Sequence, residues 1–132
     1  MFANTQMPAI NLGFPDACKV PVPPAVVVIP FPNIALTAMA TPNVFNQFIS
    51  AMPVHNLLTT IPLSNGDEPG VLGGVVSSMF IGPSRHLLGS FKVFKSCMPS
   101  TKMLCPSGQN GAALNIPGLT LTPSQLKVME LA

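Results

Sequence analysis

The side chains best suited to chemistry in this sequence are two histidines and three cysteines. They are Cys18, His55, His86, Cys97 and Cys105. Imidazole nitrogen and thiolate sulfur are preferred ligands of zinc, and four of them in a tetrahedron make a structural zinc site. No two of the five lie within four residues of each other, so only the fold could gather them. The alternative is that each is an ordinary packed or hydrogen-bonded side chain.

Catalysis is not predicted from these residues or from the carboxylates. The acidic side chains are Asp16, Asp67, Glu68 and Glu130. Only Asp67 and Glu68 are adjacent, and consecutive residues of an extended strand face opposite ways, which suits an acid–base pair poorly. Cys105 and His55 could act as nucleophile and base, but nothing beside them in sequence supplies an oxyanion hole or an orienting carboxylate. We therefore predict that the protein is not an enzyme.

The elements that position these side chains must be short strands and turns. The chain has 132 residues with 16 prolines and 10 glycines, and 48% of its residues are hydrophobic while only 8% are charged. Proline removes a backbone donor and glycine is costly to order, so long helices are disfavoured. The net charge of +2 gives no basic footprint for nucleic acid, and the mean hydropathy of +0.51 disfavours disorder. The composition therefore predicts a compact all-β domain.

Hydropathy does not predict a membrane-spanning segment. Residues 20–66 contain no charged side chain, but eight prolines interrupt this stretch. No run of about 20 residues can therefore form a spanning helix, and we expect no stable membrane insertion. Residues 1–6 carry neither a basic start nor an apolar segment, so we expect no signal peptide and cytoplasmic assembly. Delivery outside the cell would need a secretion system that does not depend on an N-terminal signal peptide.

Internal repetition is the most informative feature of the sequence. The pattern F-x-S-x-M-P occurs at residues 48–53 and again at 94–99. Each copy is followed by Asn-Gly, at 65–66 and 110–111, and then by Pro-Ser, at 83–84 and 123–124. The N-terminal third is only loosely similar, with Met7-Pro8 as its nearest match. These marks predict three imperfect repeats packed around a pseudo-threefold axis.

Local patterns place short strands in these units. The segments rich in β-branched or alternating residues are 25–29, 91–95 and 119–122. One modest helix is predicted over residues 42–51, with Thr41 as its N-cap. Residues 125–131 could form a last helical turn or a terminal strand. The expected fold is therefore many short strands separated by glycine and proline turns.

Motifs along most of the chain resemble one known family. They are residues Asn11 to Asp16, Lys19 to Pro24, Pro30 to Ala35, Asn65 to Gly70, Gly82 to Ser90, Gln109 to Gly111 and Pro123 to Gln125. They are similar to the PAAR-like family associated with type VI secretion. The resemblance implies a small conical β-domain of three related units, here a single domain over residues 1–132 with no C-terminal effector extension. It also implies a structural tip protein that caps and sharpens a trimeric VgrG-type spike.

The resemblance implies partners as well as a fold. We expect one tip per spike trimer of a type VI or related contractile injection system, and a role in recruiting effectors. The charge-free stretch 20–66 is either the docking face or the domain's own core, and Phe31, Phe45 or Phe48 are the expected anchors. The alternative function is a small effector adaptor, chaperone or immunity-type binding protein.

PAAR tips hold a structural metal with histidine and cysteine near the point, so the resemblance also implies a zinc site. Its predicted ligands are Cys18, His55, His86 and Cys105. Cys97 is left out because the repeat places it where Ala51 stands, so a small packing residue is sufficient there. Two histidines and two cysteines depart from the family's pattern of three histidines and one cysteine.

Overall fold

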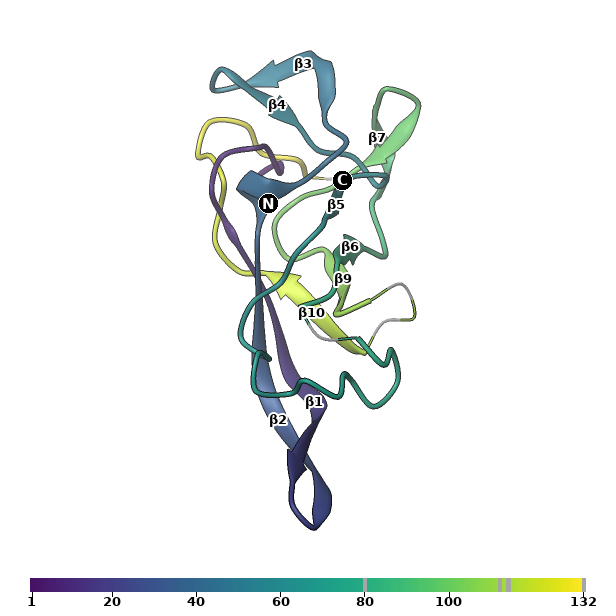
Figure 1. The fold of residues 1–132 in the computed structure, drawn as a ribbon. Helices are drawn as coiled ribbons and strands as arrows, with labels where there is room; N and C mark the ends of the chain where they lie inside the picture. The colour runs from purple at the N-terminus through teal and green to yellow at the C-terminus, as the bar shows by residue number, and fades with distance from the viewer. Residues whose placement is uncertain (80, 112, 114, 132) are drawn as a thin grey trace.

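The computed structural model describes residues 1–79, 81–111, 113 and 115–131. The molecule tapers from a broad end, where both chain termini lie, to a narrow hairpin made by its two longest strands (Figure 1). Its elements in chain order are β1 (Ile10–Val22), β2 (Ala25–Leu36), η1 (Thr37–Met39), β3 (Val44–Ile49), β4 (Met52–Val54), β5 (Thr60–Ile61), β6 (Ser84–His86), β7 (Ser90–Lys95), β8 (Met98–Ser100), β9 (Pro106–Gln109) and β10 (Ile116–Thr120). The prediction of an all-β domain is confirmed.

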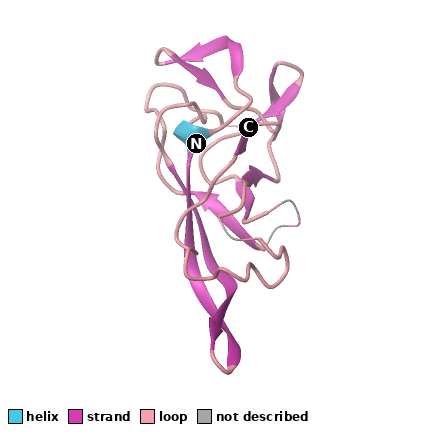
Figure 2. Ribbon diagram, viewed as in Figure 1, coloured by secondary structure: helices cyan, strands magenta, loops and turns pink. Residues whose placement is uncertain are grey.

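Helical structure is confined to one short turn in the described part of the chain (Figure 2). This turn is η1, and it has three residues. No helix among the described residues has the length and apolar character needed to cross a membrane. The helix predicted over 42–51 is wrong, because β3 and a tight turn occupy these residues. Phe48 lies opposite Pro53 and Ile49 opposite Met52, and this pairing suits aromatic and β-branched residues better than a helix does.

The main sheet closes on itself. In the described residues it has six antiparallel strands in the order β2-β1-β10-β9-β6-β5. Isolated bridges from Ile34 to Asn65 and from Thr41 to Thr60 then join its two outer edges. The strands therefore form three pairs, β1–β2, β5–β6 and β9–β10, and each pair is hydrogen-bonded to the next around the axis. Closure leaves few open edges in this half of the molecule.

A ring of three short segments lies between this sheet and the broad end. The segments are residues 3–5, 54–56 and 100–102. Bridges join the last residue of each segment to the first of the next, namely Thr5–Val54, Asn56–Ser100 and Lys102–Ala3. Backbone N–H to carbonyl bonds repeat this pattern one residue outward, namely Gln6 to Pro53, Leu57 to Pro99 and Met103 to Phe2. The pairing is cyclic, as the predicted pseudo-threefold arrangement requires.

Two hairpins above the ring carry the sequence repeat. In β3–β4 and β7–β8 every paired position of the first hairpin recurs 46 residues later in the second, from Val44 opposite Val54 to Ser90 opposite Ser100. Their turns also match, since Ser50 and Ala51 have φ of 53° and 63°, and Ser96 and Cys97 have φ of 51° and 64°. Such values are those of a two-residue hairpin turn. Met52-Pro53 and Met98-Pro99 therefore occupy equivalent positions, as the repeat predicted.

The third unit is split between the two ends of the described chain. Phe2 forms a bridge with Met129, as Pro53 does with Phe48. The N–H of Glu130 donates to the carbonyl of Met1 at 2.7 Å, and this pair corresponds in register to Ile49–Met52 and Lys95–Met98. The N-terminal match is therefore Met1-Phe2 and not Met7-Pro8. Residues 125–131 supply strand-like pairing and no helical turn.

Small and amide side chains fill the interior in place of large apolar ones. Asn11 is fully buried, and its Oδ1 accepts hydrogen bonds from Ser107 Oγ at 2.7 Å and Gln109 Nε2 at 3.1 Å. The space inside a closed sheet shrinks with its strand number, so six strands leave little room for large side chains. Large aliphatic residues are instead outside, and on the narrow hairpin Val26 and Val28 are exposed. This part of the charge-free stretch is therefore not core.

Candidate functional site

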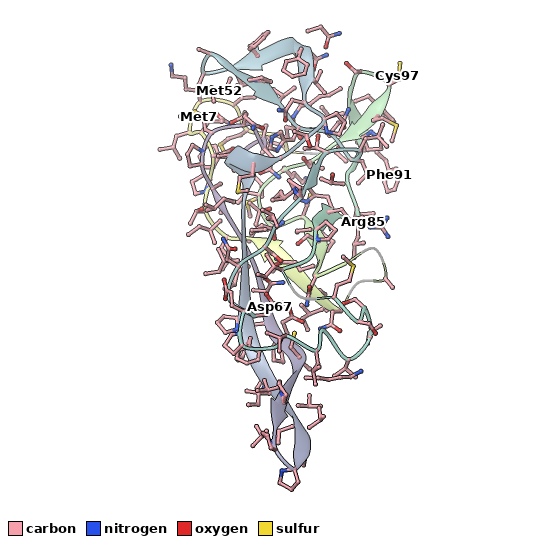
Figure 3. The ribbon with its side chains drawn as sticks, viewed as in Figure 1. Met7, Met52, Asp67, Arg85, Phe91 and Cys97 are labelled. Atoms are coloured by element: carbon pink, nitrogen blue, oxygen red, sulfur yellow. The ribbon has the colours of Figure 1, made fainter. Side chains whose placement is uncertain are left out.

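The broad end has three edges, formed by β3–β4, by β7–β8 and by the paired segments 1–2 and 126–130. Each edge exposes a pair of large apolar side chains. We call these six residues the threefold apolar face, and they are Phe45 and Phe48, Phe91 and Phe94, and Leu126 and Met129. Their exposed fractions range from 54% to 74%. Phe48, Phe94 and Met129 hold the same register position, because each lies opposite the second residue of a Met-Pro or Met-Phe pair. Phe91 is labelled in the broad half of Figure 3.

Repeated hydrogen bonds fix the second and third edges in the same shape. Ser90 Oγ accepts bonds from the N–H groups of Lys92 and Val93, at 3.3 and 3.2 Å. Gln125 Oε1 accepts bonds from Lys127 and Val128, at 2.7 and 2.8 Å. Ser90 and Gln125 each precede the second apolar residue of their edge by four positions. The Lys-Val pairs at residues 92–93 and 127–128 are therefore structurally equivalent.

A buried ion pair ties the second edge to the third. Lys95 Nζ lies 2.6 Å from Glu130 Oε1, and both side chains are less than a tenth exposed. Ser100 Oγ donates to the same carboxylate at 2.6–2.7 Å. Burial of both charges strengthens their attraction but makes either one costly alone. This contact fixes the third edge to the domain.

The two histidines lie below the apolar face. His55 is in the middle of the ring segment 54–56 and is 1% exposed, and its Nε2 is 3.0 Å from Gln6 Oε1. His86 ends β6 and is also buried, and its Nε2 is 3.5 Å from Asn4 Nδ2. Burial, with the charges of His86 and Lys95, lowers the pKa of His55 to about 3. Burial lowers the pKa of His86 to about 4, so both rings are neutral at pH 7.

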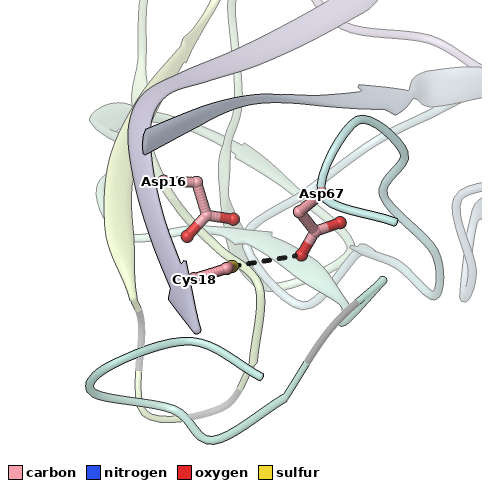
Figure 4. A group of neighbouring side chains, drawn as sticks. All are labelled: Asp16, Cys18 and Asp67. Carbon is pink, nitrogen blue, oxygen red and sulfur yellow. Dashed lines mark hydrogen bonds between the residues drawn. The ribbon is translucent and has the colours of Figure 1, made fainter. Parts of the chain in front are cut away.

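A buried cluster of Asp16, Cys18 and Asp67 lies in the narrow half (Figure 4). Their ligand atoms are all within 4.8 Å of one another, and this is the only group of three or more potential metal ligands found among the described residues. Asp16 and Cys18 face the same way because they are two residues apart on β1. Asp67 follows the turn at Asn65-Gly66. A side chain at Gly70 would place its Cβ 2.4 Å from the Cβ of Cys18, so glycine is required beside the cluster.

Hydrogen bonds hold the cluster in place. The thiol of Cys18 donates to Asp67 Oδ2 at 3.7 Å and accepts from Asn110 Nδ2 at 3.5 Å. Asp16 accepts from Asn33 Nδ2 at 3.0 Å, and Asp67 accepts from the N–H of Ile81 at 3.2 Å. Burial and the two carboxylates raise the pKa of Cys18 to about 12. Burial also raises the pKa of Asp67. Such a group favours a proton or a metal cation, since either one reduces the repulsion between its charges.

The structure does not bring the four predicted zinc ligands together. Cys18 belongs to the cluster in the narrow half, while His55 and His86 lie near the ring. Cys105 is buried beside the start of β9 and lines a surface groove. No combination of these four forms a group of three ligands within 4.8 Å in the described residues. Cys18 is therefore separated from the two histidines, which both lie beside Asn4, and sequence spacing cannot reveal this separation.

Sequence reasoning missed Asp16 and Asp67 as partners of Cys18. The signal available was the Asp-x-Cys spacing on a strand, which puts both side chains on one face. Asp67 carried only a weak signal, namely its place after an Asn-Gly turn. The expected anchor Phe31 is not on the apolar face, because it lies on β2 opposite Asp16 of the buried cluster. Phe45 and Phe48 are on that face.

Thiol labelling is expected to distinguish the three cysteines, all of which the structure describes. Cys97 is exposed in the β7–β8 turn, whereas Cys18 and Cys105 are buried. Only the thiolate reacts with iodoacetamide, and the raised pKa of Cys18 keeps it protonated. At pH 8 the native protein should therefore label at Cys97 alone, and all three should label in denaturant. Mass spectrometry of digested protein checks this, and rapid native labelling of Cys18 would contradict the buried cluster.

Comparison with models of protein families matches residues 9–118 to a model described as the toxin PAAR-like domain. The match covers the narrow hairpin, the Asp16–Cys18–Asp67 cluster and both complete hairpins of the broad end. The split third edge lies outside it. No curated protein matches the chain, and no solved structure matches it.

Proposed function

The chain belongs to the toxin PAAR-like domain family, and we propose that it is a structural tip protein that caps the trimeric spike of a type VI secretion or related contractile injection system. The family match confirms the resemblance inferred from the sequence motifs. PAAR-like domains associate with VgrG-type spikes, and docking of this chain on such a spike is the specific proposal. Its role in this proposal is mechanical and not catalytic.

The threefold apolar face is the observation that carries the proposal. A trimeric spike ends in three identical surfaces, and a single tip can contact all three only if it repeats one contact three times. The equivalent pairs Phe45 and Phe48, Phe91 and Phe94, and Leu126 and Met129 provide this repeat. Large apolar side chains exposed together mark a binding surface, and aromatic residues are enriched among binding hot spots.

Stoichiometry and salt dependence test the docking. Co-purification with a trimeric VgrG-type spike should give one tip for each three spike chains. Binding should change little between about 0.05 and about 0.5 M salt, because the face is apolar and offers little charge to screen. An effector adaptor or immunity-type protein would instead follow the effector and stay off the spike. Affinity that collapses at moderate salt would contradict apolar docking.

A single substitution on the face tests the same contact more sharply. Phe48→Asp should weaken spike binding about 30-fold or more, because a hot-spot side chain contributes about 2 kcal/mol and the new carboxylate would be buried unpaired. Val28→Asp is the matched control, since Val28 is similarly exposed but lies on the narrow hairpin. Calorimetry with the spike measures both, and both variants must keep the wild-type melting temperature. Equal losses of spike affinity for Phe48→Asp and Val28→Asp would contradict docking through the threefold apolar face.

We also propose that the Asp16–Cys18–Asp67 cluster binds one zinc ion. The donor set fits, because carboxylate oxygen and cysteine sulfur both bind zinc and a dication would offset the buried charges. Zinc would supply a cross-link between β1 and the loop that carries Asp67. This cross-link would support the narrow half, where the apolar core is small.

Metal analysis of protein purified without chelator should find about one zinc per chain. Chelation should lower the free energy of unfolding by about 4 kcal/mol if free zinc is about 1,000 times its Kd. Cys18→Ser should lose the metal, whereas Cys97→Ser, at an exposed turn, should keep it. Metal-free protein of unchanged stability would reject the zinc site and leave a protonated, hydrogen-bonded cluster.

A further inference from the structure

A surface groove lies on the flank of the second unit. Its volume is 440 Å³, and two stretches of chain form its walls, residues 88–92 and residues 102–106 without Met103. Leu88, Phe91 and Leu104 expose apolar surface there. Lys92 and Lys102 add positive charge, and none of the described residues that line the groove is acidic. A volume of this size is in the range of ligand pockets.

The groove breaks the threefold symmetry of the domain. The positions equivalent to Lys92 are Asn46 in the first unit and Lys127 in the third. Those equivalent to Lys102 are Asn56 and Thr5. The backbone turn beside the groove is nevertheless repeated, because Cys105 N donates to Lys102 O as Thr59 N donates to Asn56 O. Only the second unit therefore combines this turn with two cations.

A feature present in one unit of three is not explained by a trimeric partner. Contacts to a threefold spike need the same chemistry at all three units, and the apolar face supplies it. The groove shares Phe91 with the apolar face, but its other lining residues offer a single site per tip. Such a site suits a partner that binds as one copy. Its apolar walls and paired lysines complement a segment with acidic side chains between apolar ones.

We propose that this groove binds an extended segment of a cargo protein that presents acidic and large apolar side chains on the same face, at every second residue. In an extended segment alternate side chains face the same way. Leucine-like side chains would lie on Leu88 and Leu104, and carboxylates would reach Lys92 and Lys102. The proposal rests on the proposed function, because spike docking assigns the threefold face to another partner. One cargo chain would then be carried by each tip.

Peptide binding tests the site without knowledge of the cargo. The probe is a fluorescein-labelled pentapeptide with leucine at both ends, glutamate in the middle and serine between them, so that leucine and glutamate share one face when it is extended. Its matched control carries lysine in place of glutamate. Fluorescence anisotropy should show binding of the acidic peptide to the wild-type chain and about tenfold weaker binding of the basic one. Absence of binding by the acidic peptide, or equal binding of both, overturns the proposal.

The pseudo-symmetry provides matched variants. Leu104→Asp should weaken binding of the acidic peptide about tenfold. Leu58→Asp, at the equivalent exposed position of the first unit, should leave this binding unchanged. Lys92→Glu should also weaken it, while Lys127→Glu on the third edge should have little effect. Equal losses of peptide affinity for the two variants of either pair would contradict binding in the groove.

Spike binding by the same proteins separates this proposal from the proposed function. Leu104→Asp should lose the peptide and still bind the spike. If the wild-type chain binds the acidic peptide but no trimeric spike, the tip function fails and the groove stands as a peptide site. If it binds the spike but not the peptide, the groove proposal fails alone.

Discussion

Lowering the pH from about 7 to about 4.5 is expected to remove about 5 kcal/mol from the free energy of unfolding. The cause is the pair His55 and His86, whose folded-state pKa values are lowered to about 3 and about 4 from 6.5. Above pH 6.5 the rings are neutral in both states, so their contribution is complete. Below pH 6.5 the unfolded chain takes up protons that the folded protein cannot, and stability falls until the pH approaches the folded values.

One acidic group opposes this trend. Burial raises the pKa of Asp67 in the folded protein, so the folded state takes up its proton first as the pH falls. That uptake adds stability at acid pH but concerns a single, smaller shift. A typical domain has a free energy of unfolding of about 5–15 kcal/mol, so the net loss is enough to approach unfolding. Urea denaturation followed at several pH values measures it.

A variant identifies the histidines as the source. His86→Gln keeps an amide that can bond to Asn4 and removes one of the two titrating rings. It should reduce the loss between pH 7 and 4.5 to about half, because each ring contributes about 2.5 kcal/mol over that range. Wild-type stability that does not change over this range would show that the rings are not buried as described.

Glu130→Gln is expected to lower the free energy of unfolding by about 3–5 kcal/mol. It leaves Lys95 with a buried positive charge and no ion-pair partner, and it weakens the bond from Ser100 to the carboxylate. Chemical denaturation at pH 7 measures the loss. The third edge should also become more open to hydrogen exchange, because the pair attaches it to the second.

Two further variants control for this result. Combining Glu130→Leu with Lys95→Met should recover most of the lost stability, since removing both charges avoids an unpaired buried ion. Glu68→Gln should cost less than about 0.5 kcal/mol, because Glu68 is exposed and its carboxylate accepts one bond from Gly66. A large loss at Glu68, or none at Glu130, would contradict the buried pair.

The sequence predicted what depends on neighbouring residues. The F-x-S-x-M-P repeat identified residues 48–53 and 94–99 as equivalent positions, because a two-residue turn and its flanking residues are specified within six residues. It could not identify the third edge, whose halves lie at residues 1–2 and 126–130. The four predicted zinc ligands do not lie together in the fold for the same reason. Cys18 is on β1 of the closed sheet and His55 is on a ring segment, and only pairing across the whole chain sets the distance between them.

Local helix signals at Thr41 and Pro42 were also misleading. Capping chemistry favours a helix only when no better partner exists for the same backbone. Here Met52 and Pro53 lie immediately after the turn and pair with β3, so strand pairing prevailed. The charge-free stretch shows the same limit, because composition cannot tell an apolar outer surface from a core.

The cyclic ring also governs how the chain must fold during synthesis. Phe2 leaves the ribosome early, yet its bridge partner is Met129, and Ala3 must pair with Lys102. None of the three ring segments can complete its backbone hydrogen bonds from its own neighbourhood, so nucleation requires closure of very long loops. The ring should therefore remain open until residue 102 has been made, and the third edge until residue 129, even if local hairpins form earlier. The phenylalanines of the emerging chain should stay accessible to holding chaperones until then.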